Sequence, residues 1–235
     1  VVLVTTRRGT AGKPKISLNS SFGLTQALRN LKGVDSYTYA TLYNETQLSD
    51  NPSLKESQLG FSPYVREMFR TNADPIMFPN VDWNDYIFKN LSWQTQHNLT
   101  MSGGGDRFRY FVSLGYLLQD GMLKQLGEPY DPNYQYKRFN YRSNVDINLT
   151  KSTLLKVNIG GYVGTRREPQ TDELWRKVMW CTPFSSPGIV DGKQITNISS
   201  NRYITIGERT CALDYYYNGG YNANTDNVLN LDLAL

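Results

Sequence analysis

The sequence predicts an all-β chain whose strands are long, antiparallel and connected in chain order. Three observations predict this: polar and apolar residues alternate in six segments, the segments are long, and the connections between them are alternately long and short. Tyrosine and glycine are abundant, with 17 and 19 among 235 residues, which is typical of aromatic-bearing strands joined by tight turns.

The alternation is clearest in KRFNYRSNVDINLT, residues 137–150. From Phe139 to Leu149 every second residue is apolar, apart from one serine, and the residues between them are polar or charged. Successive side chains of a strand point to opposite faces, so this segment has one apolar and one polar face. Five further segments share the design, with Phe111 as an apolar exception on a polar face; they are residues 15–24, 93–102, 107–119, 153–164 and 227–235.

The lengths of the segments and of their connections point to a membrane. Soluble strands usually run about 5–6 residues, whereas a tilted strand crossing a bilayer needs roughly 9–11. SGGGD and LTKS are tight turns, but the connections at about 25–91, 124–135 and 166–223 are long. In an up-and-down sheet alternate connections lie at the same edge, so the long ones gather at one end, as in bacterial outer-membrane barrels.

An antiparallel up-and-down transmembrane β-barrel accounts for both faces. In hydrocarbon every backbone polar group must be paired between strands, while the polar face lines a water-containing or plugged lumen. Aromatic residues are expected near both membrane interfaces: Trp93, Tyr116, Phe139 and Tyr141 toward the long connections, and Phe108 and Tyr110 toward the turns. The alternative is a secreted or surface β-sandwich that binds carbohydrate, whose strands also alternate.

Composition excludes several other classes. No run approaches the roughly 20 consecutive apolar residues of a spanning helix, which excludes a helical membrane bundle. The net charge is +4 with scattered basic residues, so nucleic acid is not expected as a partner. The single histidine, His97, rules out a site with several histidine ligands, and no metal or cofactor is expected.

Three stretches, taken in order, resemble parts of one family. They are VVLVTTRRGTAGKPKISLNSSFG, then VDWNDYIFKN followed by WQTQHNLTMS and GGGDRFRYFVSLGYLLQDGML, and then KRFNYRSNVDINLTKSTLLKVNIGGYVGTRRE. They are similar to the plug–barrel junction, the early barrel and the next hairpin of the SusC/RagA family of TonB-dependent outer-membrane transporters of Bacteroidota. The resemblance covers most of residues 1–166 and the final strand, whereas residues 167–223 match nothing specific.

The resemblance implies a domain organisation. Residues 1–12 would end a plug domain, and residues 13–235 would begin a transmembrane barrel of about 22 strands with long extracellular loops. Six strands cannot close such a barrel, and an open edge in lipid leaves backbone groups unpaired. The chain is therefore expected to be part of a longer, multi-pass protein of the bacterial outer membrane.

The resemblance also implies a function. It is TonB-dependent active import of oligosaccharides or oligopeptides, with no enzymatic activity. The implied partners are a SusD-like surface lipoprotein over the long loops, TonB through N-terminal parts, the glycan or peptide substrate, and outer-membrane lipid.

Two sets of side chains are candidates for contact with cargo or plug. In the last long connection, REPQTDELWRKVMWC predicts a short helix begun by Thr171, and aromatic faces beside Asn and Arg donors suit sugars or peptides. These substrate-binding candidates are Trp175, Trp180, Tyr203, Tyr215, Tyr216 and Tyr217; alternatively they pack the loop's own core. The lumen- or plug-facing candidates are Arg138, Asn140, Arg142 and Asn144, with plug contact favoured because a plugged lumen needs polar partners.

No catalytic constellation is found. The acidic pairs Asp82/Asp85 and Asp172/Glu173 lack a second group at a defined spacing, and a solvated loop or helix start explains them. Cys181 and Cys211 form a disulfide in an oxidising compartment or remain two thiols; the sequence leaves both open.

Overall fold

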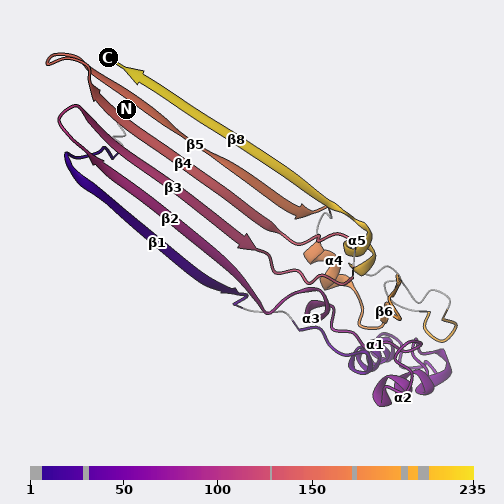
Figure 1. Ribbon diagram of the computed structural model, residues 1–235. Coiled ribbons are helices and arrows are strands. Elements are labelled where there is room, and N and C mark those ends of the chain that lie inside the picture. Colours follow the sequence, from indigo (N-terminus) through magenta and orange to yellow (C-terminus); the bar gives the residue numbers. More distant parts are fainter. Residues whose placement is uncertain (1–6, 29–31, 128, 171–173, 197–200, 206–211) are drawn as a thin grey trace.

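Six long strands form one antiparallel sheet in the computed structural model (Figure 1), which describes all residues except 1–6, 29–31, 128, 171–173, 197–200 and 206–211. The strands follow one another across the sheet in chain order, and every neighbouring pair is antiparallel. They are β1 (Gly12–Gln26), β2 (Leu91–Gly104), β3 (Phe108–Asp120), β4 (Gln135–Asn148), β5 (Leu154–Pro169) and β8 (Tyr221–Ala234). The predicted all-β, up-and-down antiparallel fold is confirmed.

The alternation of short and long connections is also confirmed. Residues 105–107 and 149–153 form the short connections at one end of the sheet, which we call the turn end. The long connections, residues 27–90, 121–134 and 170–220, gather at the other end, the loop end (Figure 1). Two strands extend well beyond the predicted segments there: β5 continues to Pro169 and β8 begins at Tyr221. Backbone pairing continues where the side chains no longer alternate cleanly, so the sequence pattern underestimates strand length.

The sheet has the two unlike faces that the alternation predicts, and the apolar face is not packed against another element of the described chain. Apolar side chains of β1 such as Ile16 and Phe22 are 68–69% exposed, and Leu229 and Leu231 of β8 are 61–68% exposed. Among the described residues, Phe111 is the one buried hydrophobic side chain that the six strands contribute, and it lies on the polar face. A second sheet covering the apolar face, as a sandwich requires, is not found in the described part.

Cross-strand register aligns the apolar residues into rows. Leu18, Leu99 and Leu114 are paired successively across β1, β2 and β3, and the row continues through Tyr141 and Gly161 to β8. Tyr141 therefore lies in the middle of β4, whereas the sequence analysis expected it near the long connections. The alternation within one segment does not show where the pairing of that strand begins and ends.

The long connections contain helices, and the sequence predicted the short one in the last connection but not the others. The first holds α1 (Ser36–Asp50), the 3-10 helix η1 (Glu56–Gln58), α2 (Pro63–Thr71) and α3 (Trp83–Ile87). The last holds α4 (Leu174–Trp180), a two-stranded sheet of β6 (Gly188–Val190) and β7 (Lys193–Ile195), and α5 (Ala212–Asn218). Among the described residues no helix is long and apolar enough to cross a membrane.

Side-chain caps explain where these helices begin. Asp35 accepts a hydrogen bond from the backbone N–H of Thr38 at 2.8 Å. Ser62 accepts one from Val65 at 3.3 Å, and Pro63 fills the first helical position, where a missing N–H does no harm. Asp82 accepts bonds from the N–H groups of Asn84 and Asp85.

Two apolar clusters join the long connections into one packed layer, the loop layer, at the loop end. One cluster brings Phe61, Phe69 and Phe78 of the first connection onto Phe184 of the last. The other includes Trp83, Ile87 and Phe88 of the first connection, Leu123 of the second, and Leu174, Val178, Leu213 and Tyr216 of the last. Each fully buried large apolar side chain contributes roughly 1.5–3 kcal/mol, so this layer has its own core.

Candidate functional site

The chain before β1 lies on the polar face of the sheet near the turn end. The guanidinium of Arg8 donates to the carboxylate of Asp146 on β4, and the side-chain amide of Asn144 donates to the carbonyl of Arg7 at 2.6 Å. Gly9 is so close to β3 that a Cβ on it would lie 2.4 Å from the backbone nitrogen of Tyr110. Asn144 is consequently buried, although it belongs to the polar face.

The other three lumen-facing candidates lie on the same face of β4 but nearer the loop end. Arg138 donates from Nε to Oδ1 of Asn140 at 2.8 Å, and its guanidinium carbon lies 4.0 Å from the ring centre of Tyr162 on β5. Arg142 is exposed. The structure therefore separates the four candidates: Asn144 contacts the N-terminal segment, whereas Arg138 and Asn140 contact each other.

A cavity of about 300 Å³ lies where the strands reach the loop end. Its lining includes Gln94, Gln119, Tyr134, Tyr136 and Arg166. Gln119 donates to the side-chain carbonyl of Gln94 at 2.8 Å, and Arg166 forms an ion pair with Glu168 at 3.4 Å. Burial, and after it the charge of Glu168, raises the pKa of Tyr134, so this phenol stays neutral and keeps its donor hydrogen.

Three of the predicted loop aromatics help to pack the loop layer. The ring of Trp175 stacks on Phe88 with centroids 4.1 Å apart and planes 8° apart. Tyr216 is only 1% exposed, and its hydroxyl donates to the carbonyl of Lys124 at 2.5 Å. Tyr217 donates to the carbonyl of Gly127 at 3.3 Å. For Tyr216 the structure leaves no exposed ring for cargo.

Two other predicted aromatics present surface. Trp180, at the end of α4, is 70% exposed. Tyr203 is partly exposed, and its ring packs against Tyr64 and Phe78 with centroid distances of 5.6 and 5.9 Å. The guanidinium carbon of Arg202 lies 4.9 Å from the centre of the Tyr203 ring. The predicted helix is present as α4, but Thr171, its predicted first residue, and the side chain of Tyr215 lie outside the described residues.

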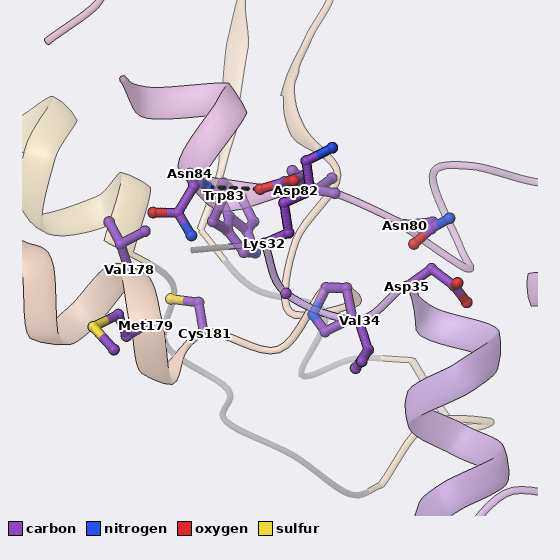
Figure 2. A pocket seen from close by; sticks show the side chains of 13 residues that line it. Lys32, Val34, Asp35, Asn80, Asp82, Trp83, Asn84, Val178, Met179 and Cys181 are labelled. Atoms are coloured by element: carbon purple, nitrogen blue, oxygen red, sulfur yellow. Dashed lines mark hydrogen bonds between the residues drawn. The ribbon is translucent and has the colours of Figure 1, made fainter. Parts of the chain in front are cut away.

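A larger cavity, of about 460 Å³, lies inside the loop layer and was not predicted (Figure 2). It is lined by residues 32–35, 80–84 and several of 178–183. In Figure 2 the side chains of Val178, Met179 and Cys181 stand opposite Val34. The carboxylates of Asp35 and Asp82 are used as helix caps, and the lining combines polar with apolar side chains. Its three segments are far apart in the chain, so no local pattern could have revealed it.

The histidine and the cysteines considered in the sequence analysis show no sign of a metal site among the described residues. Both ring nitrogens of His97 have hydroxyl neighbours, Ser20 at 2.7 Å and Thr95 at 2.9 Å. Among the described residues no group of three or more His, Cys, Asp or Glu side chains is placed to hold a metal ion. The sulfur of Cys181 accepts from the N–H of Ala212 at 2.9 Å, but Cys211 lies outside the described residues, so the disulfide and the two thiols both stay open.

No protein-family model matches this chain. It is 30% identical over 167 residues to TonB-dependent receptor P3 of Formosa agariphila, a match that covers 71% of this chain and 13% of that receptor. It is 26% identical over 125 residues to TonB-dependent receptor SusC of Bacteroides thetaiotaomicron, covering 53% of this chain and 10% of SusC. The chain thus spans about an eighth or less of the length of these relatives.

A solved structure with a similar arrangement is that of the RagAB peptide importer in its closed-closed state. The TM-score is 0.49 at 20% sequence identity, and the match covers 68% of this chain and 19% of that one.

Proposed function

This chain is a relative of the TonB-dependent receptors, SusC among them, and from that premise we propose that it is part of an outer-membrane protein that actively imports oligosaccharides or oligopeptides. The observation that carries the proposal is the unpacked apolar face of the six strands. A continuous face this rich in Leu, Ile, Val and aromatic side chains is unfavourable in water, and hydrocarbon is the partner that it fits.

The size of the apolar face supports a membrane. On β3 it runs from Phe108 to Leu118, which are ten positions apart. Ten residues of strand cover about 34 Å, or about 24 Å of depth at a tilt of about 45°, close to the apolar band of about 25 Å in outer-membrane barrels. Phe108 and Tyr110 stack at the turn end, and Phe22 and Trp93 stack toward the loop end, where interfacial aromatic girdles belong.

The connections supply an orientation. Short connections face the periplasm and long ones the outside in barrels of this kind, so the loop layer is extracellular and the turn end is periplasmic. Residues 1–12 are then the end of a plug domain that enters the lumen from the periplasmic side. The contacts of Arg7 and Arg8 with the polar face near the turn end support this placement.

The remaining edges of the sheet fit a larger barrel. In the described chain β1 and β8 each pair with one neighbour only, and both carry exposed leucines. Further strands of a longer protein, about 22 in all, would satisfy these edges and close the lumen. A SusD-like lipoprotein over the loop layer and TonB at the periplasmic side complete the proposed machine.

Cargo is proposed to meet the exposed aromatics of the loop layer first. Trp180 and Tyr203 keep the exposure that such contact needs, and Trp175 presents the ring face that Phe88 does not cover. Aromatic faces beside Arg202 suit sugars and peptides alike, so these residues support both cargo classes.

Fractionation and uptake test the proposal on the full-length protein that contains this chain. We expect it in the outer-membrane fraction, extracted only with detergent and together with a surface lipoprotein. Cells should take up a labelled oligosaccharide or oligopeptide, and uptake should stop when TonB is deleted or the protonmotive force is collapsed. Recovery of the protein as a monodisperse monomer in plain buffer would contradict the proposal.

A further inference from the structure

The polar face of β4 is divided between two environments. From the loop end to the turn end its side chains are those of Tyr136, Arg138, Asn140, Arg142, Asn144 and Asp146. In the described chain, the contacts of Arg7 and Arg8 with β4 are with the last two of these. The stretch from Tyr136 to Arg142 belongs to a different part of the face, nearer the loop layer.

Two tyrosine rings cover a glycine in this upper stretch. A Cβ added to Gly164 of β5 would lie 3.4 Å from the hydroxyl of Tyr136 and 3.6 Å from the ring of Tyr162, so both side chains lean over it. Arg138 stacks on Tyr162 at 4.0 Å and is held from the side by Asn140. The side chains of three strand positions thus form a small aromatic platform with a fixed guanidinium, which we call the tyrosine–arginine platform.

The platform is continuous with the cavity of about 300 Å³ at the loop end, because Tyr136 belongs to both. That cavity adds amides from Gln94 and Gln119 and a second guanidinium from Arg166. Gln119 donates to the carbonyl of Gln94, and the amide nitrogen of Gln94 takes no part in that bond. Farther down the face, the amides of Asn98 and Asn140 close over Gly115, where an added Cβ would lie 3.0 Å from Oδ1 of Asn98.

Positive charge dominates this region. Arg138, Arg142 and Arg166 face it, and two nearby carboxylates have cationic partners: Asp120 is paired with Lys89 at 2.9 Å, and Glu168 with Arg166. A third, Asp226 of β8, shares the row of Arg138 across Gly164. Since Arg166 and Glu168 compensate each other, the guanidinium groups of Arg138 and Arg142 stand against the single carboxylate of Asp226, a balance that favours an anionic ligand.

We infer that the tyrosine–arginine platform and the adjoining cavity form a subsite for anionic oligosaccharides, whose acidic group is a carboxylate or a sulfate. The inference rests on the proposed import function and specifies its cargo. Tyrosine rings accept the apolar face of a pyranose, side-chain amides bind its hydroxyl groups, and guanidinium groups bind a carboxylate or sulfate with two parallel hydrogen bonds. An acidic peptide could pair with the arginines. Unlike an oligosaccharide, however, it does not offer a ring face in every unit for the tyrosines to stack on.

The test uses the full-length protein in detergent and calorimetric titration with short oligosaccharides in matched pairs. The pairs are oligouronates and their neutral methyl esters, and one neutral oligosaccharide with and without added sulfate groups. We expect at least one free acid or sulfated form to bind at least about tenfold more tightly than its uncharged counterpart, the effect of one charge-assisted contact of about 1.5 kcal/mol. Whether carboxylates or sulfates bind more tightly identifies the acidic group.

Matched variants locate the subsite. Arg138→Gln should remove most of the preference for acidic sugars, and Tyr162→Leu should weaken acidic and neutral sugars alike. Lys137→Gln is the control, because Lys137 is the neighbour on the opposite face and carries the same charge. Equal losses in Arg138→Gln and Lys137→Gln would overturn the inference.

The ligand comparison decides the matter even if a variant fails to fold. Equal affinity of the wild-type protein for acidic and neutral sugars, or binding of acidic peptides but of no sugar, would also overturn the inference. If the cells take up a neutral sugar or an acidic peptide in a TonB-dependent way, the proposed import function stands and only the anionic subsite is wrong. If the protein is absent from the outer membrane, both the proposed function and the subsite are wrong.

Discussion

Arg8 donates a hydrogen bond to Asp146, which follows it by 138 positions in the chain and lies on the polar face of β4. Asn144, two residues earlier on the same face, donates to the carbonyl of Arg7. These two contacts fasten the chain before β1 to the part of the sheet that we place inside a lumen, at the periplasmic end. They give the proposed plug–barrel boundary a physical form that can be tested.

Breaking the ion pair should loosen the N-terminal segment without unfolding the sheet. Because the pair is partly buried, Asp146→Asn should lower local stability on the order of 1 kcal/mol, and amides near Gly9 should exchange hydrogen several-fold faster. Hydrogen exchange followed by mass spectrometry measures this. The charge-exchanged double variant Arg8→Asp with Asp146→Arg should restore part of the protection; unchanged exchange in Asp146→Asn would show that the pair does not hold the segment.

Two neighbouring glycines of β5 should respond differently to the same substitution. A Cβ on Gly161 would lie 1.9 Å from the carbonyl oxygen of Val228 and 2.7 Å from the hydroxyl of Tyr141, which itself donates to that carbonyl. A Cβ on Gly160, on the opposite face, meets nothing closer than 3.6 Å. Gly161→Ala should therefore destabilise the β5–β8 pairing by about 1–3 kcal/mol, as overpacking does.

The assay for this pair is heat-dependent migration of the folded protein on a detergent gel. Gly161→Ala should shift to the unfolded position at a lower temperature than the wild type, while Gly160→Ala should stay close to it. Equal thermal shifts in both variants would contradict the close approach of Tyr141 and Val228 to β5.

The loop layer should depend on one buried asparagine. The Asn44 side chain donates to the carbonyl of Phe61 at 2.7 Å and accepts from its N–H at 3.0 Å. Asn44→Ala leaves both backbone groups buried without these partners, which costs about 1–3 kcal/mol for each group left unsatisfied. Limited proteolysis should then cut the first long connection faster. Thr46→Ala, on the exposed side of the same helix, is the control and should leave the cleavage rate unchanged.

Two tryptophans of α4 separate the alternatives of cargo contact and loop packing. Trp180 is mostly exposed, so Trp180→Ala should leave the loop layer's stability within about 0.5 kcal/mol and should weaken cargo binding. Trp175 stacks on Phe88, so Trp175→Ala should lower stability as well. Calorimetric cargo binding and proteolysis of the loop layer, measured on both variants, provide the comparison. A Trp180→Ala variant with full cargo affinity would exclude this residue from the contact surface.

The sheet was predictable because its signal is local. Alternation along one strand is visible in residues 137–150 alone, and short turns such as SGGGD follow directly from their glycines. The same locality explains the error at Tyr141: the pattern locates an alternating core but not how far the pairing extends. The sequence resemblance to the SusC/RagA family is confirmed by the relatives, SusC included.

The loop layer was predictable only in part, because its helices are stabilised by distant partners. Phe61 and Phe69 become buried on Phe184, more than 100 positions later, so the first connection read as a loop. The capping residues Asp35, Ser62 and Asp82 were local signals that could have located helix starts. Tyr216 and Trp180 are both aromatic residues of the last long connection, and nothing in the sequence distinguishes their roles. Only the packing shows that Tyr216 is buried and Trp180 is exposed.

The central claim is that hydrocarbon covers the apolar face of the sheet, and spin labels along β3 test it most directly. Single cysteines at positions 108–118 of the full-length protein in lipid would carry the label, with collision rates measured against oxygen, which favours lipid, and a water-soluble nickel complex. We predict that labels at Tyr110, Val112, Leu114 and Tyr116 collide more with oxygen, and those at Arg109, Ser113 and Leu117 more with nickel. Nickel access on both faces, or protection of the even positions from both reagents, would contradict the account.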